Sequence, residues 1–467
     1  MQKDGYNWYL NASPFKLITQ TSWLLFAAIF ALLAYEVVES AIIAKHGDNS
    51  LALFGFILPV TTYLSATAIA IAIRSNMVLV KSHHAQGEYI TSLMLWAGLT
   101  AILISTLFYF SKGVLLSLLG FDVWLSQFSM QDQAIYHTQI TSYLDFKIYA
   151  LIALFFIWQI CTILRTLGYH KRSASLMLGW MLFKIFILVW IIDPKSTQLI
   201  TQLGQLHIIS DMIFALLGLI LLAHKKEFCF QTIKFDIIFK DKKTSVILML
   251  QQLIPPLSLA FLMALVARVD ESQLGVFSLV FRLEPLLLVL PMVLTASLPA
   301  SVGLNFWSGN KRCCYQVLKL SFIFIAVFQL IIAVLVNVYM SQLIDVLCPN
   351  CEQVKMIKNY LALLPFGYIA LGMVVLYPSC LNAIGKPNQA FIILILHRMV
   401  LIPIFVLLAF FSGQQNNMYF ALFFAHIAAG LFVFIHFKKT MSSEAYKHQE
   451  MKYTADKIEL DLHDQSL

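Results

Sequence analysis

Two carboxylates, those of Glu36 and Glu39, stand one turn apart in an otherwise apolar helical stretch. Residues three apart on a helix share a face, so the two charges act directly on each other. Close carboxylates in a low-dielectric cavity titrate as a unit and can hold one proton near neutral pH. Such a pair is suited to exchanging a proton for a cation. The alternative is that both carboxylates are solvated near the end of their helix.

The composition of the chain places these glutamates in a membrane. Of the 467 residues, 60% are hydrophobic and only 12% are charged, and the mean hydropathy is +0.79. Twelve apolar runs of helical length have their centres near Phe30, Tyr63, Ala101, Leu154, Ile185, Leu216, Leu259, Leu290, Phe324, Leu371, Met399 and Phe424. We therefore predict an all-α integral membrane protein with about 12 transmembrane helices. The first run has no small-residue cleavage site and is interpreted as a retained span.

The net charge of +8 is distributed unevenly over the predicted loops. If both termini are cytoplasmic, 22 of the 32 lysines and arginines lie on the inner side and 6 on the outer side. The positive-inside rule therefore predicts a multi-pass protein of the plasma (inner) membrane with both termini in the cytoplasm. Basic residues placed in this way require no nucleic-acid partner.

Further charged residues are predicted within or near spans, namely Asp145, Lys147, Lys184, Asp211, Arg282, Glu284 and Arg398. Charges at that depth pair with one another or mark a functional site. Lys184 lies mid-span and is the strongest secondary candidate, as the partner of Glu36 or Glu39 in a structural or a switching ion pair. The other candidate charge partners or cavity residues are Asp145, Asp211, Glu284 and Arg398. His397 is interpreted as a packed or interfacial histidine.

The two halves of the chain resemble each other. Ala41 to Lys45 with Leu51 to Phe54 corresponds to Ala264 to Arg268 with Leu274 to Phe277, and Leu164 to Gly168 corresponds to Leu381 to Gly385. Six helices in each half give a parallel pseudo-two-fold repeat about the membrane normal. We predict an N-terminal six-helix lobe, a surface-lying amphipathic cytoplasmic linker, a C-terminal six-helix lobe and a cytoplasmic tail, over residues 1–225, 226–245, 246–437 and 438–467.

Cysteine placement and motif searches give little sign of enzymatic chemistry. Cys348 and Cys351 form a Cys-Pro-Asn-Cys motif in a predicted outer loop. A thioredoxin-type site would need a βαβ context, so the motif is interpreted as a small structural disulfide or as two free thiols. The sequence has no phosphate-binding glycine-rich loop, zinc-ligand spacing or nucleophile elbow, so no catalytic residue, cofactor or metal is predicted.

Five segments in order resemble the multidrug and toxic compound extrusion (MATE) family of the MOP flippase superfamily. They are Val38 to Ala44, Ala52 to Pro59, Leu164 to Gly168, Pro291 to Gly303 and Leu381 to Gly385. The resemblance implies a V-shaped pair of six-helix lobes that exports bulky, often cationic, amphipathic compounds in exchange for protons or sodium. It also implies a coupling role for Glu39, which stands where the family has an aspartate on its first helix.

The second half of the chain departs from the sodium-coupled branch of that family. Members of the branch carry a glutamate on helix seven after a proline, whereas here Pro255 and Pro256 are followed by no acid until Asp270. They also carry an aspartate on helix ten, at the position of Leu371. Coupling by carboxylates therefore falls to the first lobe, a pattern that resembles the DinF-like branch.

Taken together, these features predict a secondary active antiporter rather than an enzyme. It would export amphipathic, cationic drugs or metabolites in exchange for protons, with sodium as the less favoured ion and Glu39 and Glu36 as the coupling site. Its predicted partners are a small-molecule substrate and membrane lipid, and it is expected to be a monomer. The alternative is a lipid-linked oligosaccharide or lipid flippase of the same superfamily, whose anionic cargo would favour surplus basic groups. The embedded charges instead number five acids against four bases.

Overall fold

A computed structural model describes residues 12–81, 86–167, 169–193, 196, 198–224, 242–269, 274–348, 354–411 and 418–442 of the chain. All regular elements within these residues are helices, so the predicted all-α fold is confirmed. Most of the predicted linker, residues 226–241, and the tail beyond residue 442 lie outside the described residues. The amphipathic character of the linker therefore stays a prediction.

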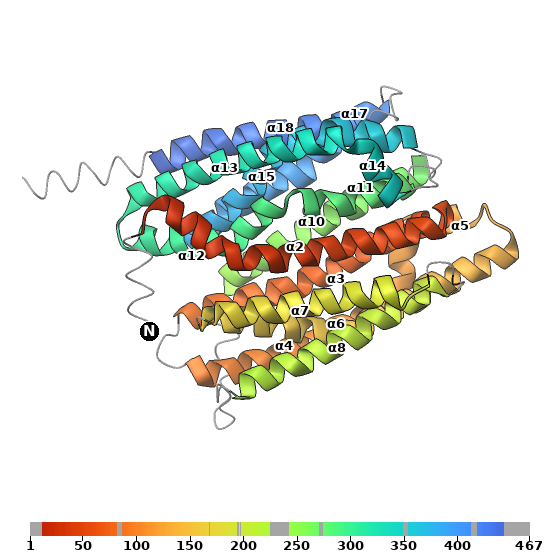
Figure 1. Cartoon of the computed structure of the whole chain (residues 1–467), viewed down its shortest axis with the longest axis horizontal. Helices are drawn as coiled ribbons and strands as arrows, with labels where there is room; N and C mark the ends of the chain where they lie inside the picture. The colour runs from red at the N-terminus through yellow and green to blue at the C-terminus, as the bar shows by residue number, and fades with distance from the viewer. Residues whose placement is uncertain are drawn as a thin grey trace, which may run out of the picture. The chain divides into compact units, whose positions relative to one another are not determined.

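The helices of the first half are α2 (Pro14–His46), α3 (Asp48–Lys81), α4 (Gln86–Leu118), α5 (Phe121–Leu125), α6 (Met130–Thr166), α7 (His170–Trp190) and α8 (Leu199–His224) (Figure 1). The second half contains α10 (Lys242–Val269), α11 (Leu274–Leu287), α12 (Val289–Trp307), α13 (Lys311–Val338), α14 (Met340–Leu347), α15 (Val354–Ala383), α16 (Pro387–Ile395), α17 (Ile402–Phe411) and α18 (Met418–Phe437). Two π-helical segments, η2 (Leu396–Leu401) and η4 (Lys438–Ser442), follow α16 and α18.

The number of membrane spans agrees with the prediction. Among the described residues, 11 helices are long and apolar enough to cross a membrane, and the bent pair α11 and α12 brings the number to as many as 12. The break falls at Leu288, between Pro285 and Pro291. Proline cannot donate a backbone hydrogen bond and bends the helix that contains it, which accounts for a broken span at this place.

Residue contacts divide the chain into two compact units. Unit 1 comprises Met1–Phe26, Leu290–Val334 and Leu363–Leu467, and unit 2 comprises Ala27–Val289 and Leu335–Ala362. Within unit 2, α3 packs on α6, α10 and α11, and α6 packs on α4, α7 and α8. Unit 2 thus includes α10, α11 and α14 from the second half of the sequence. The predicted lobes, which describe the sequence repeat, stay a prediction.

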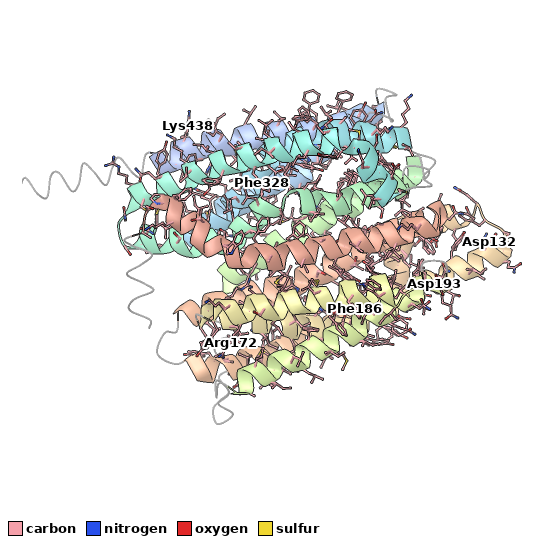
Figure 2. All side chains as sticks on the ribbon, viewed as in Figure 1. Asp132, Arg172, Phe186, Asp193, Phe328 and Lys438 are labelled. Carbon is pink, nitrogen blue, oxygen red and sulfur yellow. The ribbon has the colours of Figure 1, made fainter. Side chains whose placement is uncertain are left out.

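Apolar side chains lie on the outside of the helices as well as between them. Phe186 on α7, for example, is 56% exposed (Figure 2), and Trp190 on the same helix is 78% exposed. Exposed apolar side chains on a span are suited to contact with lipid tails. No water is present at that depth, so polar groups need hydrogen-bond partners within the protein. Hydroxyl groups in the spans accordingly donate to carbonyl oxygens one turn earlier, as Ser75 does to Ile71 at 3.0 Å.

The Cys-Pro-Asn-Cys motif is partly described. Cys348, directly after α14, is disulfide-bonded. Of the two interpretations of the Cys-Pro-Asn-Cys motif, a free thiol is therefore wrong for Cys348. Cys351 lies outside the described residues.

One glycine in unit 1 allows two helices to touch. A Cβ atom added to Gly430 of α18 would lie 2.5 Å from the Cβ atom of Ala370 on α15 and 2.9 Å from its Cα atom. We expect Gly430→Ala to lower the free energy of unfolding by about 1 to 3 kcal/mol, because backbone would have to move. The matched control is Gly113→Ala on α4, where a Cβ meets nothing within 4 Å. Thermal unfolding in detergent should separate the two variants, and equal midpoints would contradict the close contact.

Candidate functional site

Glu39 is the centre of a buried polar network in unit 2. Its side chain on α2 is only 2% exposed. Oxygen Oε1 accepts hydrogen bonds from the hydroxyl groups of Tyr35, at 3.2 Å, and Tyr143, at 3.5 Å. The same oxygen lies 2.8 Å from Nε2 of His207 on α8. A carboxylate surrounded by donors in this way is held in one orientation.

Arg282 binds the other oxygen of the Glu39 carboxylate. Its Nη1 atom lies 2.8 Å from Oε2 of Glu39 and 3.3 Å from the backbone oxygen of Glu36. The guanidinium also stacks on the ring of Phe54, with 4.1 Å between Cζ and the ring centroid. Arg282 is 4% exposed, so its charge depends on Glu39 and on the aromatic face for compensation. This contact ties α2 to α11.

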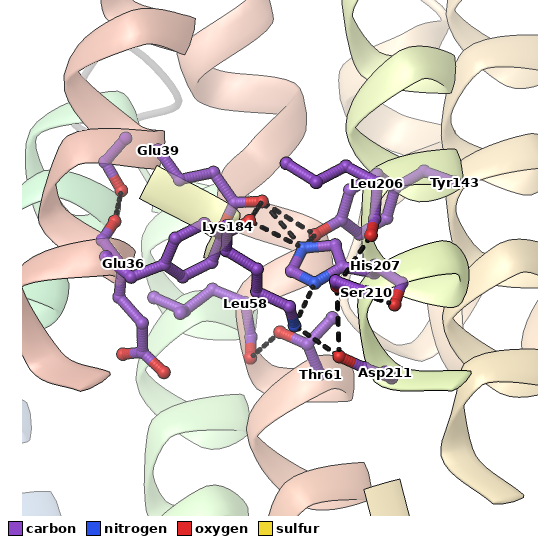
Figure 3. Close-up of polar contacts among 12 residues, drawn as sticks. Glu36, Glu39, Leu58, Thr61, Tyr143, Lys184, Leu206, His207, Ser210 and Asp211 are labelled. Carbon is purple, nitrogen blue, oxygen red and sulfur yellow. Dashed lines mark hydrogen bonds and ion pairs between the residues drawn. The ribbon is translucent and has the colours of Figure 1, made fainter. Parts of the chain in front are cut away.

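His207 connects Glu39 to a second ion pair. Its Nδ1 atom lies 3.2 Å from Nζ of Lys184 on α7. A lysine ammonium can only donate, so Nδ1 accepts and the ring proton is on Nε2, from which it is donated to Glu39. Figure 3 shows the imidazole between the two side chains. The network therefore assigns a neutral His207 with a defined tautomer.

The second ion pair joins Lys184 to Asp211. Nζ of Lys184 lies 2.5 Å from Oδ1 of Asp211, and both side chains are 4% exposed. The same Asp211 oxygen accepts from Nε1 of Trp180 at 2.9 Å and from the hydroxyl of Ser210 at 3.3 Å. The predicted direct pairing of Lys184 with Glu36 or Glu39 is thus replaced by contacts to Asp211 and His207. Lys184 still belongs to the network of Glu39.

The ionisable groups that these hydrogen bonds and ion pairs join have balanced charges. They include two acids, Glu39 and Asp211, two bases, Lys184 and Arg282, and the neutral His207. Adding or removing one proton would leave a single uncompensated charge among groups that are at most 4% exposed, which is costly in a low-dielectric interior. Among the described residues, no three His, Cys, Asp or Glu side chains gather as a metal site would require. A change in the protonation of one group would therefore disturb the contacts of the others.

Glu36 is placed differently from its predicted partner. Its side chain is half-buried, and no hydrogen bond or ion pair to a described residue is formed by its carboxylate. In Figure 3 this carboxylate points away from His207 and Glu39. The two glutamates share a helix, but only Glu39 enters the network.

The remaining predicted site residues lie elsewhere. Asp145 forms a partly exposed ion pair with Lys112 of α4, which places it outside the Glu39 network. Glu284 is buried on α11. Arg398 is half-buried on η2 and belongs to unit 1, whereas the network belongs to unit 2. Lys147 lies over the ring of Tyr143, with 5.9 Å between Nζ and the ring centroid.

Several network residues were absent from the predicted site. Arg282 was recognised as an embedded charge but not as a site residue, and His207, Tyr35 and Tyr143 were not singled out. A signal for His207 is present in the sequence, since it stands one turn before Asp211 on an apolar helix. Two ionisable residues four apart share a face and reach the same neighbours.

Comparisons with known proteins agree with the family resemblance. A sequence model of the MatE family matches residues 248–408. A curated relative from Shewanella oneidensis, named FAD transporter, is 29% identical over 168 residues. That match covers 36% of this chain and 37% of the relative's length.

Solved structures show a similar fold over nearly the whole chain. A variant of the MATE transporter VcmN from Vibrio cholerae has a TM-score of 0.72 at 22% identity and covers 92% of this chain and 97% of its own. A MOP superfamily transporter from Pyrococcus furiosus has a TM-score of 0.77 at 13% identity, covering 94% and 98%. At these identities the likeness shows the fold. These relatives are named as transporters, and the MatE match over residues 248–408 and the shared fold agree with the resemblance of the sequence to the MATE family.

Proposed function

We propose that this protein is a proton-coupled antiporter of the MATE family in which Glu39 is the coupling carboxylate. The observation that carries the proposal is the position of Glu39, buried and held at 2.8 Å by both His207 and Arg282. A proton is favoured over sodium because the strongest neighbours of the carboxylate are nitrogen donors, whereas hard cations take oxygen ligands. The second half of the chain lacks the acids that the sodium-coupled branch carries, on helix seven after the prolines and at the position of Leu371. The proposal therefore follows the DinF-like branch, with coupling by first-half carboxylates.

Protonation of Glu39 would change the contacts of α2. A neutral carboxylic acid no longer compensates Arg282 and is a weaker acceptor for the Nε2 proton of His207. Both links from α2, to α8 and to α11, would then weaken together. A proton thus favours a second arrangement of these helices, which is the requirement for coupling a proton to a conformational change.

Glu36 is the group that we assign to a cationic substrate. Its carboxylate is close to Glu39 in sequence yet outside the network, so it is available to an amphipathic cation. Protonation from the outer side would release the substrate, and deprotonation toward the cytoplasm would restore affinity. This scheme uses the orientation that the charge distribution of the loops predicts, with both termini on the cytoplasmic side of the plasma membrane. No cofactor or nucleic acid enters this scheme, and a monomer is sufficient for it.

Transport in proteoliposomes tests the proposal. The purified protein would be given an imposed pH gradient and ethidium as a flat cationic probe, with an equal sodium gradient at constant pH as the control. We expect ethidium movement against its gradient only when protons flow the other way. Movement under the sodium gradient alone would contradict proton coupling.

A second candidate cargo is FAD or a similar anionic flavin. The curated relative is named FAD transporter, and three cations, Arg282, Lys184 and Lys147, lie around Glu39. A guanidinium released from a protonated Glu39 is suited to binding phosphate. FAD in the same vesicles would separate the candidates, since movement of FAD without movement of ethidium would favour this one.

A further inference from the structure

Two histidines of unit 1 form a buried pair that the proposed mechanism does not use. Nε2 of His397, on η2, lies 3.0 Å from Nδ1 of His426, on α18. Each residue is 1% exposed. The outer nitrogens of the pair, Nδ1 of His397 and Nε2 of His426, have no hydrogen-bond partner among the described residues. The prediction that His397 is a packed or interfacial histidine is incomplete, because its ring is hydrogen-bonded to the imidazole of His426.

The surroundings of the pair contain few ionisable groups. Its neighbours are α15, which contributes Tyr368 with 6.2 Å between ring centroids, and the helices α16, α17 and α18. None of the described segments α15, α16, η2, α17 and α18 contains an aspartate or a glutamate. Arg398, next to His397 on η2, is the charged residue that acts on the pair. The imidazoles are thus the groups of this cluster that can take up a proton once water reaches them.

A neutral pair leaves two polar atoms without partners. One ring donates to the other, so one outer nitrogen is an acceptor and the other a donor, and both are buried. Leaving such buried atoms unsatisfied is unfavourable. An added proton would convert the bridge into a charge-assisted hydrogen bond, which is about twice as strong as a neutral one. Burial and the positive charge of Arg398 both oppose a positive charge on the imidazole pair. Uptake of a proton by the pair therefore requires access of water.

The backbone at His397 offers a place where such access can arise. His397 and Arg398 stand in a π-helical turn within the apolar span Pro387–Phe411. A π turn contains one extra residue, loosens the hydrogen-bond ladder and frequently occurs at functional sites. We propose that His397 and His426 form a second proton-binding site: when unit 1 opens this turn to water, one added proton binds the outer acceptor nitrogen, and the pair shares the positive charge across the hydrogen bond between Nε2 and Nδ1.

The shared proton can be observed without measuring transport. The full chain, labelled with ¹⁵N at histidine and held in lipid nanodiscs, would be titrated from about pH 8 to about pH 5, the range in which an imidazole changes charge. We expect one unprotonated outer nitrogen to disappear on acidification, while coupling across the bridging hydrogen bond persists. His426→Phe and His397→Phe assign the signals; if a variant does not fold, the coupling itself assigns them. Uptake of two protons at separate pH values, or of none, would overturn the shared site.

A transport measurement asks whether this proton takes part in the cycle, and that part rests on the proposed function. With one proton at Glu39 and one at the pair, log rate against pH should have a slope of about two in the wild type and about one in His426→Gln. The control is His436→Gln, which changes a histidine ten residues further along α18 and should leave the slope unchanged. Equal slopes in wild type and His426→Gln would remove the pair from the cycle. Wild-type transport that ignores pH would instead refute the proposed function and leave the titration result standing.

Discussion

Glu39→Gln is expected to abolish transport driven by a pH gradient and to lower the free energy of unfolding by about 3 kcal/mol, because it leaves a buried charge without its partner. Glutamine keeps the size and the acceptor oxygen, so the contact with His207 can persist. The guanidinium of Arg282, 4% exposed, loses the negative charge 2.8 Å away. Chemical denaturation in detergent and proton uptake in proteoliposomes measure the two effects.

Two further variants separate charge from function. Glu39→Gln combined with Arg282→Met removes both charges, and we expect it to recover most of the stability but none of the coupling. Glu36→Gln changes a carboxylate outside the network, so stability should stay within about 0.5 kcal/mol of wild type, as for a substitution away from special features. Proton-coupled transport at the wild-type rate by Glu39→Gln would rule out Glu39 as the coupling group.

Lys184→Met is expected to lower the free energy of unfolding by about 3 to 5 kcal/mol, since it strands the carboxylate of Asp211 in the interior. Asp211 would keep the donors of Trp180 and Ser210 but lose its cation. The substitution also removes the donor to Nδ1 of His207. His207 would then be free to exchange its tautomer, and the orientation of its Nε2 proton toward Glu39 would no longer be fixed.

The chain provides a matched control for Lys184. Lys112→Met breaks the partly exposed ion pair with Asp145, and pairs of this kind contribute about 0 to 1 kcal/mol. Adding Asp211→Asn to Lys184→Met removes the stranded charge and keeps an acceptor for Trp180, so it should restore stability. Equal losses for Lys112→Met and Lys184→Met would mean that burial of the second pair has little energetic effect.

Much of the fold follows from hydropathy alone. Every one of the predicted span centres lies within a helix, including Leu290 in the broken pair and Met399 in the π-helical segment. This succeeds because a bilayer requires long apolar helices whose backbone groups bond internally. The break at Leu288 and the π turn at His397 were not predicted, since apolar composition does not reveal where the hydrogen-bond ladder changes.

The candidate site could be predicted only in part. Glu39, Lys184 and Asp211 were recognised because a full charge in an apolar helix stands out from its neighbours. Their pairing was not, because the choice among cations depends on how α2, α7, α8 and α11 face one another, which no local pattern encodes. His207 was missed because a neutral imidazole is tolerated in an apolar helix and gives no charge signal.

The separation of 243 residues between Glu39 and Arg282 has a consequence for biosynthesis. A ribosome adds about 5 to 20 residues per second, so α2 leaves it roughly 12 to 50 seconds before α11 can supply the arginine. During that interval Glu39 either enters the membrane protonated or stays outside it until His207, 168 residues later in the chain, has been synthesised. A nascent chain stalled before α11 should therefore expose Glu39 to carboxyl-directed labelling, and the label should be excluded once Arg282 has been inserted.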